Sequence, residues 1–284
     1  MRNRISIKYD LLCCVVVLGL LLAACGPEAA TSAPETPTPE QAAAEAITLN
    51  VFAAASLTDA FSAIAEVYEA EHPGVDVVLQ FASSSTLAAQ IGQGAPADVY
   101  ASANPNQMAV AVESGRVAED AVVTFAGNRL VLIVPAQNPA AIESVADLAT
   151  GEVALVLAAP DVPVRVYTDQ LLVALSAEPD YGAGFPAAVL ANLVSEEPNV
   201  RQVVARVALG EADAAIVYSS DVTPDVAGDL QAIALPEAVN PTASYPIAPL
   251  SDSAQAEQAQ SFVDYVLSEA GQAILTGWGF LPAP

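Results

Sequence analysis

Short apolar runs alternate along the chain with segments whose apolar residues recur at helical spacing. The runs predict buried strands at residues 47–53, 75–81, 98–101, 129–135, 153–158 and 214–218. The periodic segments predict helices at residues 58–70, 86–91, 106–114, 142–148, 166–175, 200–209, 261–267 and 270–275. Alternation of this kind is typical of parallel sheets with helices on both faces, so the pattern predicts an α/β fold. The periodic part, about 240 residues, exceeds one typical domain and favours two lobes.

The N-terminal segment has a different pattern. Arg2, Arg4 and Lys8 precede an apolar run from Leu11 to Leu22 that is too short for a confident membrane span. The run ends in Leu-Ala-Ala-Cys-Gly, which resembles a bacterial lipoprotein signal. We therefore expect residues 1–24 to be removed and Cys25 to be acylated, anchoring the protein to a membrane on its extracytoplasmic side; an ordinary signal peptide is the alternative.

Residues 25–46 follow as a linker. Beyond Cys25 they contain four prolines, four glutamates and no large apolar side chain. A segment with that composition cannot bury a core, so it predicts a disordered tether between the lipid and the folded part.

Charge narrows the classes of partner. The chain has 8 Lys+Arg against 33 Asp+Glu, a formal charge of −25. Phosphate backbones and anionic lipid surfaces are bound through Lys and Arg. Nucleic acid is therefore not an expected partner, and binding to acidic lipid surfaces is disfavoured. Loss of residues 1–24 would remove the single lysine and two of the three cysteines, which leaves no disulfide and no cysteine-based metal site.

Two predicted strand-to-helix turns carry serines. Ser56 follows the first strand, and Ser83, Ser84 and Ser85 follow the second. Each serine alone is more often a helix cap than a ligand contact. Because ligands of α/β sheets bind at the carboxyl ends of strands, and helix starts offer free N–H groups, two such turns in succession indicate an anion site.

Five segments resemble the substrate-binding proteins of molybdate ABC transporters. They read FAAASLTDAF (52–61), VVLQFASSSTLAAQIGQGAPADVYASA (77–103), APDVPV (159–164), AAIVYSSD (214–221) and GWGFLP (277–282). The resemblance implies the two-lobed, type II periplasmic-binding-protein fold, in which each lobe is a mostly parallel sheet flanked by helices and the ligand cleft lies between them. It places lobe 1 at residues 47–127 plus 240–284, and lobe 2 at residues 128–239.

The resemblance also implies which residues bind the oxyanion. Ser56 and Ser84 match serines that donate through hydroxyl and backbone N–H groups, Val164 and Val200 match backbone N–H donors, and Tyr218 matches a tyrosine whose hydroxyl reaches the anion. Ser84 is chosen over Ser83 by its position in the motif. Family members often have glycine after the position of Val164, where this chain has Arg165; arginine there either strains the turn or adds charge to the pocket.

The implied function is capture of molybdate and its delivery to a membrane permease driven by a separate ATPase, by a monomer that needs no cofactor and uses no direct metal-cation ligands. Molybdate and tungstate carry no proton at neutral pH, whereas phosphate usually carries one. A pocket built only of donors leaves a phosphate O–H without an acceptor, which disfavours phosphate. Sulfate is smaller and would be held loosely, so we expect molybdate and tungstate both to bind.

Other functions remain open at this point. The ligand could be sulfate or another tetrahedral oxyanion, and from other classes the chain could be a serine hydrolase using Ser56 or an adhesive lipoprotein. The hydrolase alternative is weak because the single histidine, His72, lies in a His-Pro-Gly turn and is expected to be a surface loop residue. Asp98 is expected to make a structural hydrogen bond, and Tyr167 either lines the cleft or packs.

Overall fold

The computed structural model describes residues 46–283, which belong to one compact unit. The predicted signal peptide, Cys25 and nearly all of the tether lie outside the described residues. Within residues 46–283, the helices are too short or too polar to cross a bilayer.

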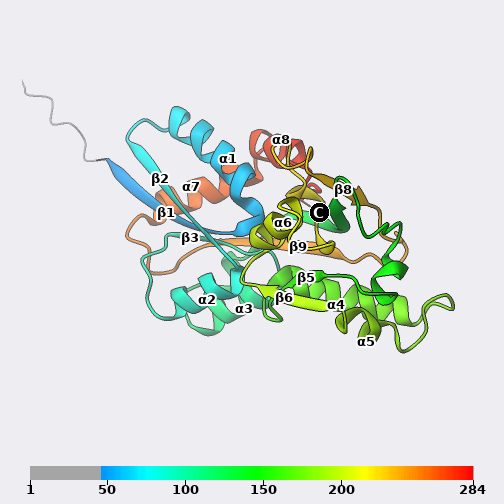
Figure 1. The fold of residues 1–284 in the computed structure, drawn as a ribbon. Helices are drawn as coiled ribbons and strands as arrows, with labels where there is room; N and C mark the ends of the chain where they lie inside the picture. The colour runs from blue at the N-terminus through cyan, green and yellow to red at the C-terminus, as the bar shows by residue number, and fades with distance from the viewer. Residues whose placement is uncertain (1–45, 284) are drawn as a thin grey trace, which may run out of the picture. The chain divides into compact units, whose positions relative to one another are not determined.

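The strands form two groups, which we call the first and the second sheet. The first sheet contains β1 (Ile47–Ala54), β2 (Val75–Ala82), β3 (Val99–Ala101) and β9 (Thr242–Pro249). The second contains β5 (Leu155–Ala158), β6 (Leu193–Glu197), β7 (Ala214–Tyr218) and β8 (Leu230–Ile233). A long strand, β4 (Val123–Pro135), belongs to both. Figure 1 shows β1, β2 and β3 of the first sheet on one side of the molecule and β5 and β6 of the second on the other.

Helices flank each sheet. Those of the first are α1 (Thr58–Glu71), α2 (Ser84–Gly92), α3 (Pro105–Glu113), α7 (Ala256–Leu267) and α8 (Glu269–Gly277). Those of the second are α4 (Pro163–Ser176), α5 (Phe185–Leu190) and α6 (Val200–Ala208). Short 3-10 helices occur at η1 (Ala55–Leu57), η2 (Glu119–Ala121), η3 (Val145–Ala149) and η4 (Ser219–Asp221).

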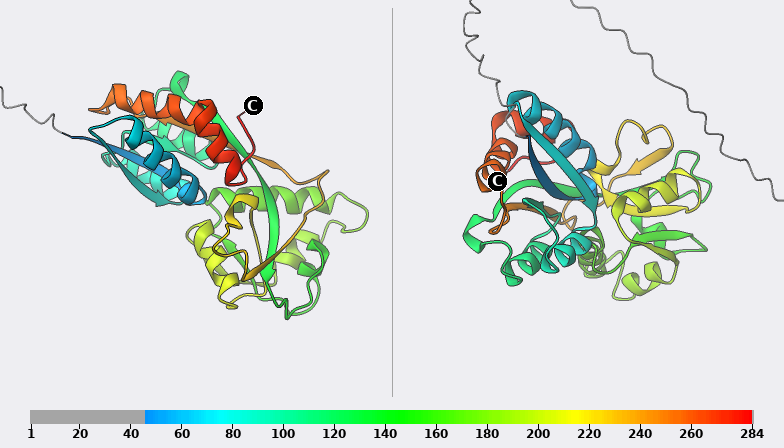
Figure 2. Two further views of the ribbon diagram at one scale, coloured as in Figure 1. Left: turned by 90° about the horizontal axis from the view of Figure 1, so that it is seen from above. Right: turned by 90° about the vertical axis from the view of Figure 1, so that its left-hand side faces the viewer.

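The strand β4 changes partners halfway along its length. Its first part, Val123–Arg129, pairs with β9, and its second part, Leu130–Pro135, pairs with β7 and β8. The central pairs of each sheet, β1 with β2 and β3, and β5 with β6 and β7, are parallel, whereas the pairs that involve β4 or β9 are antiparallel. Figure 2 shows β4 running between the two groups of elements. The expected lobe boundaries, at residues 127–128 and 240, fall at this change of partner; the division into lobes stays a prediction.

Most predicted elements are present, with some differences. The expected helix at residues 142–148 is wrong in its first half: residues 142–144, which follow Ala141 with its φ of +53°, are not helical, and the second half is the 3-10 helix η3. Sequence periodicity missed α5, β6, β8, β9 and the first half of β4. Those segments are short or carry Pro, Gly and polar residues, as in β9 with Pro246 and Pro249, so their apolar pattern is weak.

The C-terminal helices α7 and α8 pack beside α1. The ring of Phe262 lies 6.1 Å from that of Phe61 in α1, and the ring of Phe280 lies 5.4 Å from that of Tyr245 in β9. Gly271 allows α8 to approach the end of α7, because a Cβ there would lie 2.3 Å from the carbonyl oxygen of Tyr265. This packing fixes α1, whose N-terminal end adjoins the site described next.

Candidate functional site

Four strands end at one place in the structure, and each is followed there by the start of a helix. β1 leads into η1 and α1, β2 into α2, β5 into α4, and β6 into α6. The first N–H groups of a helix have no partner inside the helix, and the helix dipole is positive at that end. The arrangement therefore gathers unpaired N–H donors from both sheets.

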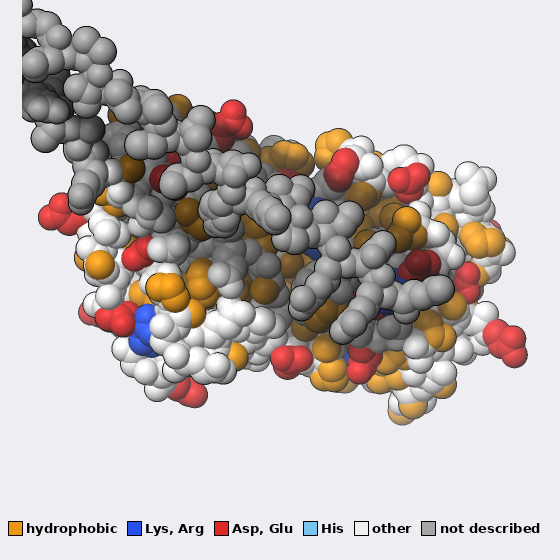
Figure 3. Space-filling model, turned by 60° about the vertical axis from the view of Figure 1, so that its left-hand side comes forward, with side chains coloured by type: hydrophobic (Ala, Val, Ile, Leu, Met, Phe, Trp, Pro, Cys, Tyr) orange, Lys and Arg blue, Asp and Glu red, His pale blue; other side chains and the backbone are white. Residues whose placement is uncertain are grey.

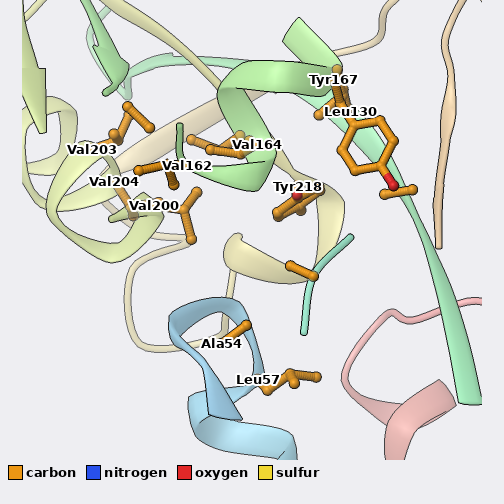
Figure 4. Packing of buried hydrophobic residues seen from close by; sticks show 14 of the residues in the cluster. Ala54, Leu57, Leu130, Val162, Val164, Tyr167, Val200, Val203, Val204 and Tyr218 are labelled. Carbon is orange, nitrogen blue, oxygen red and sulfur yellow. The ribbon is translucent and has the colours of Figure 1, made fainter. Parts of the chain in front are cut away.

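A small cavity lies between these helix starts. Within residues 46–283 its lining is neutral throughout and consists of Ala54, Ala55, Ser56, Ser83, Ser84, Ala103, Val162, Pro163, Val164, Asn199, Val200 and Tyr218. Figure 4 shows Val162, Val164, Val200 and Tyr218 on one side, with Ala54, at the end of β1, and Leu57, in η1, across from them. The structure thus brings together all five residues that the sequence resemblance named, and each of these is at most 4% exposed.

The two neighbouring serines of the second turn have different surroundings. Ser83 caps α2: its Oγ accepts the N–H of Thr86 (3.2 Å) and contacts the hydroxyls of Ser85 and Thr86. Ser84 is the first residue of α2, and its Oγ accepts the N–H of Ala103 (2.9 Å). Because the Ser84 oxygen already accepts this bond, its own proton is available to a ligand in the cavity.

The second sheet contributes backbone donors. Val164 is the second residue of α4, after Pro163, and Val200 is the first residue of α6. The Oδ1 of Asn199 caps α6 by accepting the N–H of Gln202 (3.1 Å). The N–H groups of Val164 and Val200 lie within the first turns of their helices, where no preceding turn offers them a carbonyl.

Tyr218 is the last residue of β7, and its side chain is buried. Its hydroxyl has no hydrogen-bond partner among the described residues, although it lines the cavity. Burial, with the nearby Tyr245 and Tyr167, raises the pKa of Tyr218 well above its ordinary value, so the phenol stays protonated. A buried hydroxyl without a partner is costly, which marks Tyr218 as a donor that a ligand would satisfy.

Polar contacts join the two sheets around the cavity. The guanidinium of Arg201, in α6, pairs with the carboxylate of Asp59 in α1 and donates from Nε to the carbonyl of Ala55 (3.3 Å). The Nε2 of Gln107, in α3, donates to the carbonyl of Asp161 (3.2 Å). These bonds hold the two sides of the cavity against each other.

Asp221, in η4, is fully buried behind the cavity. Its Oδ2 accepts the N–H of Tyr218 (3.0 Å), and its Oδ1 lies 3.7 Å from Nε of Arg201. Burial raises the pKa of Asp221 to about 7; Arg201 and the Tyr218 N–H oppose this shift, and Asp59 adds to it. The carboxyl is therefore partly protonated near neutral pH.

Arg165 neither strains the backbone nor enters the cavity. It lies inside α4 with helical geometry, and among the described residues only Asn138 and Ala141 are non-glycine residues with positive φ. Its guanidinium donates to Asp169 (2.9 Å), Glu196 (2.6 Å) and the carbonyl of Ala158 (3.1 Å). The sequence suggested that Arg165 either strains the turn or adds charge to the pocket, and both predictions are wrong. The helix starts early enough to include Arg165, and two carboxylates hold its guanidinium away from the cavity.

The remaining candidates do not line the cavity, although the ring of Tyr167 packs against that of Tyr218 (6.4 Å). His72 ends α1, where its ring stacks on Tyr68 at 3.9 Å and its Nδ1 contacts the Tyr68 carbonyl (2.8 Å). Asp98 accepts bonds from the backbone N–H of Asn50 (2.7 Å) and the hydroxyl of Ser253 (2.6 Å), a structural role. The hydroxyl of Tyr167 accepts the N–H of Ser244 (3.1 Å). Residues 46–283 hold no cluster of three or more His, Cys, Asp or Glu side chains suited to a metal ion.

Sequence reasoning missed several residues that line the cavity, among them Ala103 and Asn199. Ala103 follows β3, so the rule that ligands bind at the carboxyl ends of strands was a signal that could have found it. Asn199 directly precedes α6 as its cap, and the start of that helix was predicted. Tyr245 and Asn128, which lie behind Ser56, gave no such signal, because β9 and the first half of β4 were not predicted.

Comparison with known proteins places the chain in a family. Residues 49–281 match the family model of bacterial extracellular solute-binding proteins. The chain belongs to this family. Its fold is the α/β periplasmic-binding-protein fold, as predicted, and membership of a family of binding proteins confirms the expectation that it is not an enzyme.

Individual relatives are similar over most of their length. The chain is 38% identical to the molybdate-binding protein ModA of Mycobacterium tuberculosis, over 97% of this chain and 98% of the relative. It is 27% identical to the putative ABC transporter substrate-binding lipoprotein YvgL of Bacillus subtilis, over 96% and 98%. The solved substrate-binding domain of a putative molybdenum ABC transporter from Clostridium difficile is 29% identical, with a TM-score of 0.62, covering 84% of this chain and all of that domain.

Proposed function

We propose that this protein captures molybdate outside the cytoplasm and delivers it to an ABC importer. The observation that carries the proposal is the neutral cavity, into which the two sheets present hydroxyl and backbone N–H donors. Ser56, Ser84 and Tyr218 supply hydroxyls, and Val164 and Val200 supply N–H groups. The names of the relatives, which include molybdate-binding proteins, support the same ligand.

The donor set suits a doubly charged oxyanion. Helix starts and backbone N–H groups stabilise negative charge without a lysine or arginine in contact with the ligand. An anion held only by donors must itself be able to accept every bond. Molybdate and tungstate do so, whereas hydrogen phosphate would bury an O–H with no acceptor. We therefore expect tungstate to bind as well as molybdate, with no cofactor involved.

Donors from both sides of the cavity give a reason for closure on the ligand. A ligand selects a closed form only through contacts that are better there, and an anion reaches all five donors only when both sheets surround it. The closed protein, acting as a monomer, would then be recognised by a membrane permease coupled to an ATPase. Nucleic acid is not an expected partner.

Thermal unfolding tests the proposal directly. A ligand that binds only the folded state stabilises it by RT ln(1 + [L]/Kd), so 1 mM molybdate or tungstate should raise Tm by several degrees. Equal concentrations of hydrogen phosphate and of chloride serve as controls and should leave Tm unchanged. If molybdate and tungstate leave Tm unchanged as well, the proposed ligand class is wrong.

A lipid anchor at Cys25 is part of the proposal. The lipoprotein signal at residues 22–26 supports it, and the similar YvgL is named a lipoprotein. The variant Cys25→Ser should move the protein from the membrane fraction to the soluble fraction, as measured by fractionation of cells that express it. A serine variant that still sediments with membranes would contradict the anchor.

A further inference from the structure

Behind Ser56 lies a buried series of hydrogen-bonded side chains. The hydroxyl of Tyr245, in β9, lies 3.0 Å from Oγ of Ser56, and Nδ2 of Asn128, in β4, lies 3.4 Å from the Tyr245 hydroxyl. Asn128 is fully buried, as is Tyr245. These hydrogen bonds therefore run from β4, which the two sheets share, through β9 to one of the proposed ligand-binding hydroxyls.

The orientation of the Asn128 amide is set by its other partners. Oδ1 of Asn128 accepts the backbone N–H of Arg129 (2.9 Å) and the hydroxyl of Ser219 (3.0 Å). A backbone N–H can only donate, so the oxygen of the amide must face it. The Nδ2 group, which can also only donate, then faces the Tyr245 hydroxyl and Oγ of Ser220 (2.8 Å).

This orientation fixes the direction of the next bond. The Tyr245 hydroxyl accepts a hydrogen bond from Nδ2 of Asn128 (3.4 Å), and the hydrogen bond open to its own proton is that to Oγ of Ser56 (3.0 Å), since the nearby Tyr218 hydroxyl makes no hydrogen bond among residues 46–283. Burial raises the pKa of Tyr245 well above its ordinary value, so the phenol keeps that proton. Ser56 accordingly accepts from Tyr245, and its own proton is left to point elsewhere. Ser56 lines the cavity, so that proton is available to the ligand.

We propose that Asn128 and Tyr245 are positioning residues that direct the Ser56 proton toward the ligand and thereby strengthen discrimination against protonated oxyanions. The inference rests on the proposed function and assigns the source of its selectivity. Oγ of Ser84 likewise accepts one bond, from the N–H of Ala103 (2.9 Å), and can donate its own proton at the same time. Without Tyr245, the Ser56 hydroxyl is free to rotate and to accept the proton of hydrogen phosphate.

The test is the ratio of Kd for hydrogen phosphate to Kd for molybdate at pH 8, where both anions are mainly dianions and phosphate keeps one proton. Tyr245→Phe keeps the ring contacts with Phe125, Tyr218 and Phe280 and removes only the hydroxyl. We expect Tyr245→Phe to weaken molybdate binding about tenfold and to narrow the ratio at least tenfold. Tyr167→Phe is the matched control, since it also removes a buried hydroxyl but one bonded to the N–H of Ser244, and it should leave the ratio unchanged.

A purely structural role for Tyr245 would weaken both anions in proportion and leave the ratio within twofold of that of the natural protein, which would overturn the proposal. Asn128→Asp is the second variant, used whether or not Tyr245→Phe folds. A carboxylate at position 128 draws the Tyr245 proton away from Ser56, so the ratio of the two Kd values should again narrow. The added charge repels both dianions alike and does not itself change the ratio. An unchanged ratio would overturn the proposal. Failure of the natural protein to bind molybdate would instead contradict the proposed function.

Discussion

Ser84 is expected to contribute more to ligand binding than its neighbour Ser83, although both line the cavity. The hydroxyl of Ser83 caps α2 by accepting the N–H of Thr86, whereas the hydroxyl proton of Ser84 is available to the ligand. Ser84→Ala should weaken molybdate binding by about 1–3 kcal/mol, as calorimetry would measure. Ser83→Ala should chiefly lower stability, by about 1 kcal/mol, through loss of the cap. A larger loss of affinity in Ser83→Ala would show that the motif was placed one residue out of register.

Removal of the Tyr218 hydroxyl should affect binding but not lower stability. Its hydroxyl has no partner among residues 46–283, so removing it costs the free protein no internal hydrogen bond. Tyr218→Phe should leave the free protein at least as stable as the natural one, with Tm equal or a few degrees higher. The same variant should bind molybdate more weakly, by about 1–3 kcal/mol. Unchanged affinity, with or without a change in Tm, would remove Tyr218 from the ligand contacts.

At the scale of elements, η4 places a buried carboxyl between the two sheets. The pKa of Asp221 is raised by burial to about 7 from its ordinary value of 3.8, so the folded state binds a proton that the unfolded state releases between these pH values. Stability from this group is therefore fully present at low pH and is lost as pH rises toward and through about 7, by up to about 4 kcal/mol.

Comparison with Asp221→Asn isolates this effect from the other carboxylates. The amide oxygen can still accept the N–H of Tyr218, but the side chain cannot ionise. The difference in free energy of unfolding between Asp221→Asn and the natural protein, measured by denaturant titration, should shift in favour of the variant as pH rises from 4 to 8. A difference that is independent of pH would mean that Asp221 has an ordinary pKa.

The elements that form the site were largely predictable, whereas those that hold it in place were not. Strong apolar runs and helical spacing identified β1, β2, β7 and α6, and the motif carried Ser56, Ser84 and Tyr218 onto their ends. β9 contains two prolines and several small residues, and its role comes from long-range pairing with β3 and β4, which leaves no local signal. Tyr245 was missed for that reason, and Arg165 was misjudged because the start of α4 precedes its apolar pattern.

At the scale of the whole molecule, the acidic surface and the anion site act over different distances. The chain carries a formal charge of −25, and the face in Figure 3 shows Asp and Glu at many places and few Lys or Arg. Four of the arginines in residues 46–283 are paired with carboxylates, and Arg129 donates to the carbonyl of Asn240 (2.7 Å). Net charge governs approach of the ligand, whereas the bound anion feels the local N–H groups and hydroxyls.

Salt should therefore speed the capture of molybdate. Screening shortens the range over which the acidic surface repels an approaching dianion, while contacts inside the enclosed cavity are screened much less. Stopped-flow measurement of the association rate from 10 mM to 300 mM NaCl should show an increase, with a smaller change in the dissociation rate. An association rate that falls with salt would show that an arginine attracts the ligand.

The central claim is that a neutral cavity of donors selects unprotonated tetrahedral oxyanions of the size of molybdate. Isothermal titration calorimetry with molybdate, tungstate, sulfate and hydrogen phosphate, under one buffer condition, tests it most directly. The predicted result is tight, one-to-one binding of molybdate and tungstate, weaker binding of sulfate, and the weakest binding of hydrogen phosphate. Absence of heat with all four anions would contradict oxyanion capture, and tighter binding of phosphate than of molybdate would contradict selection by donors alone.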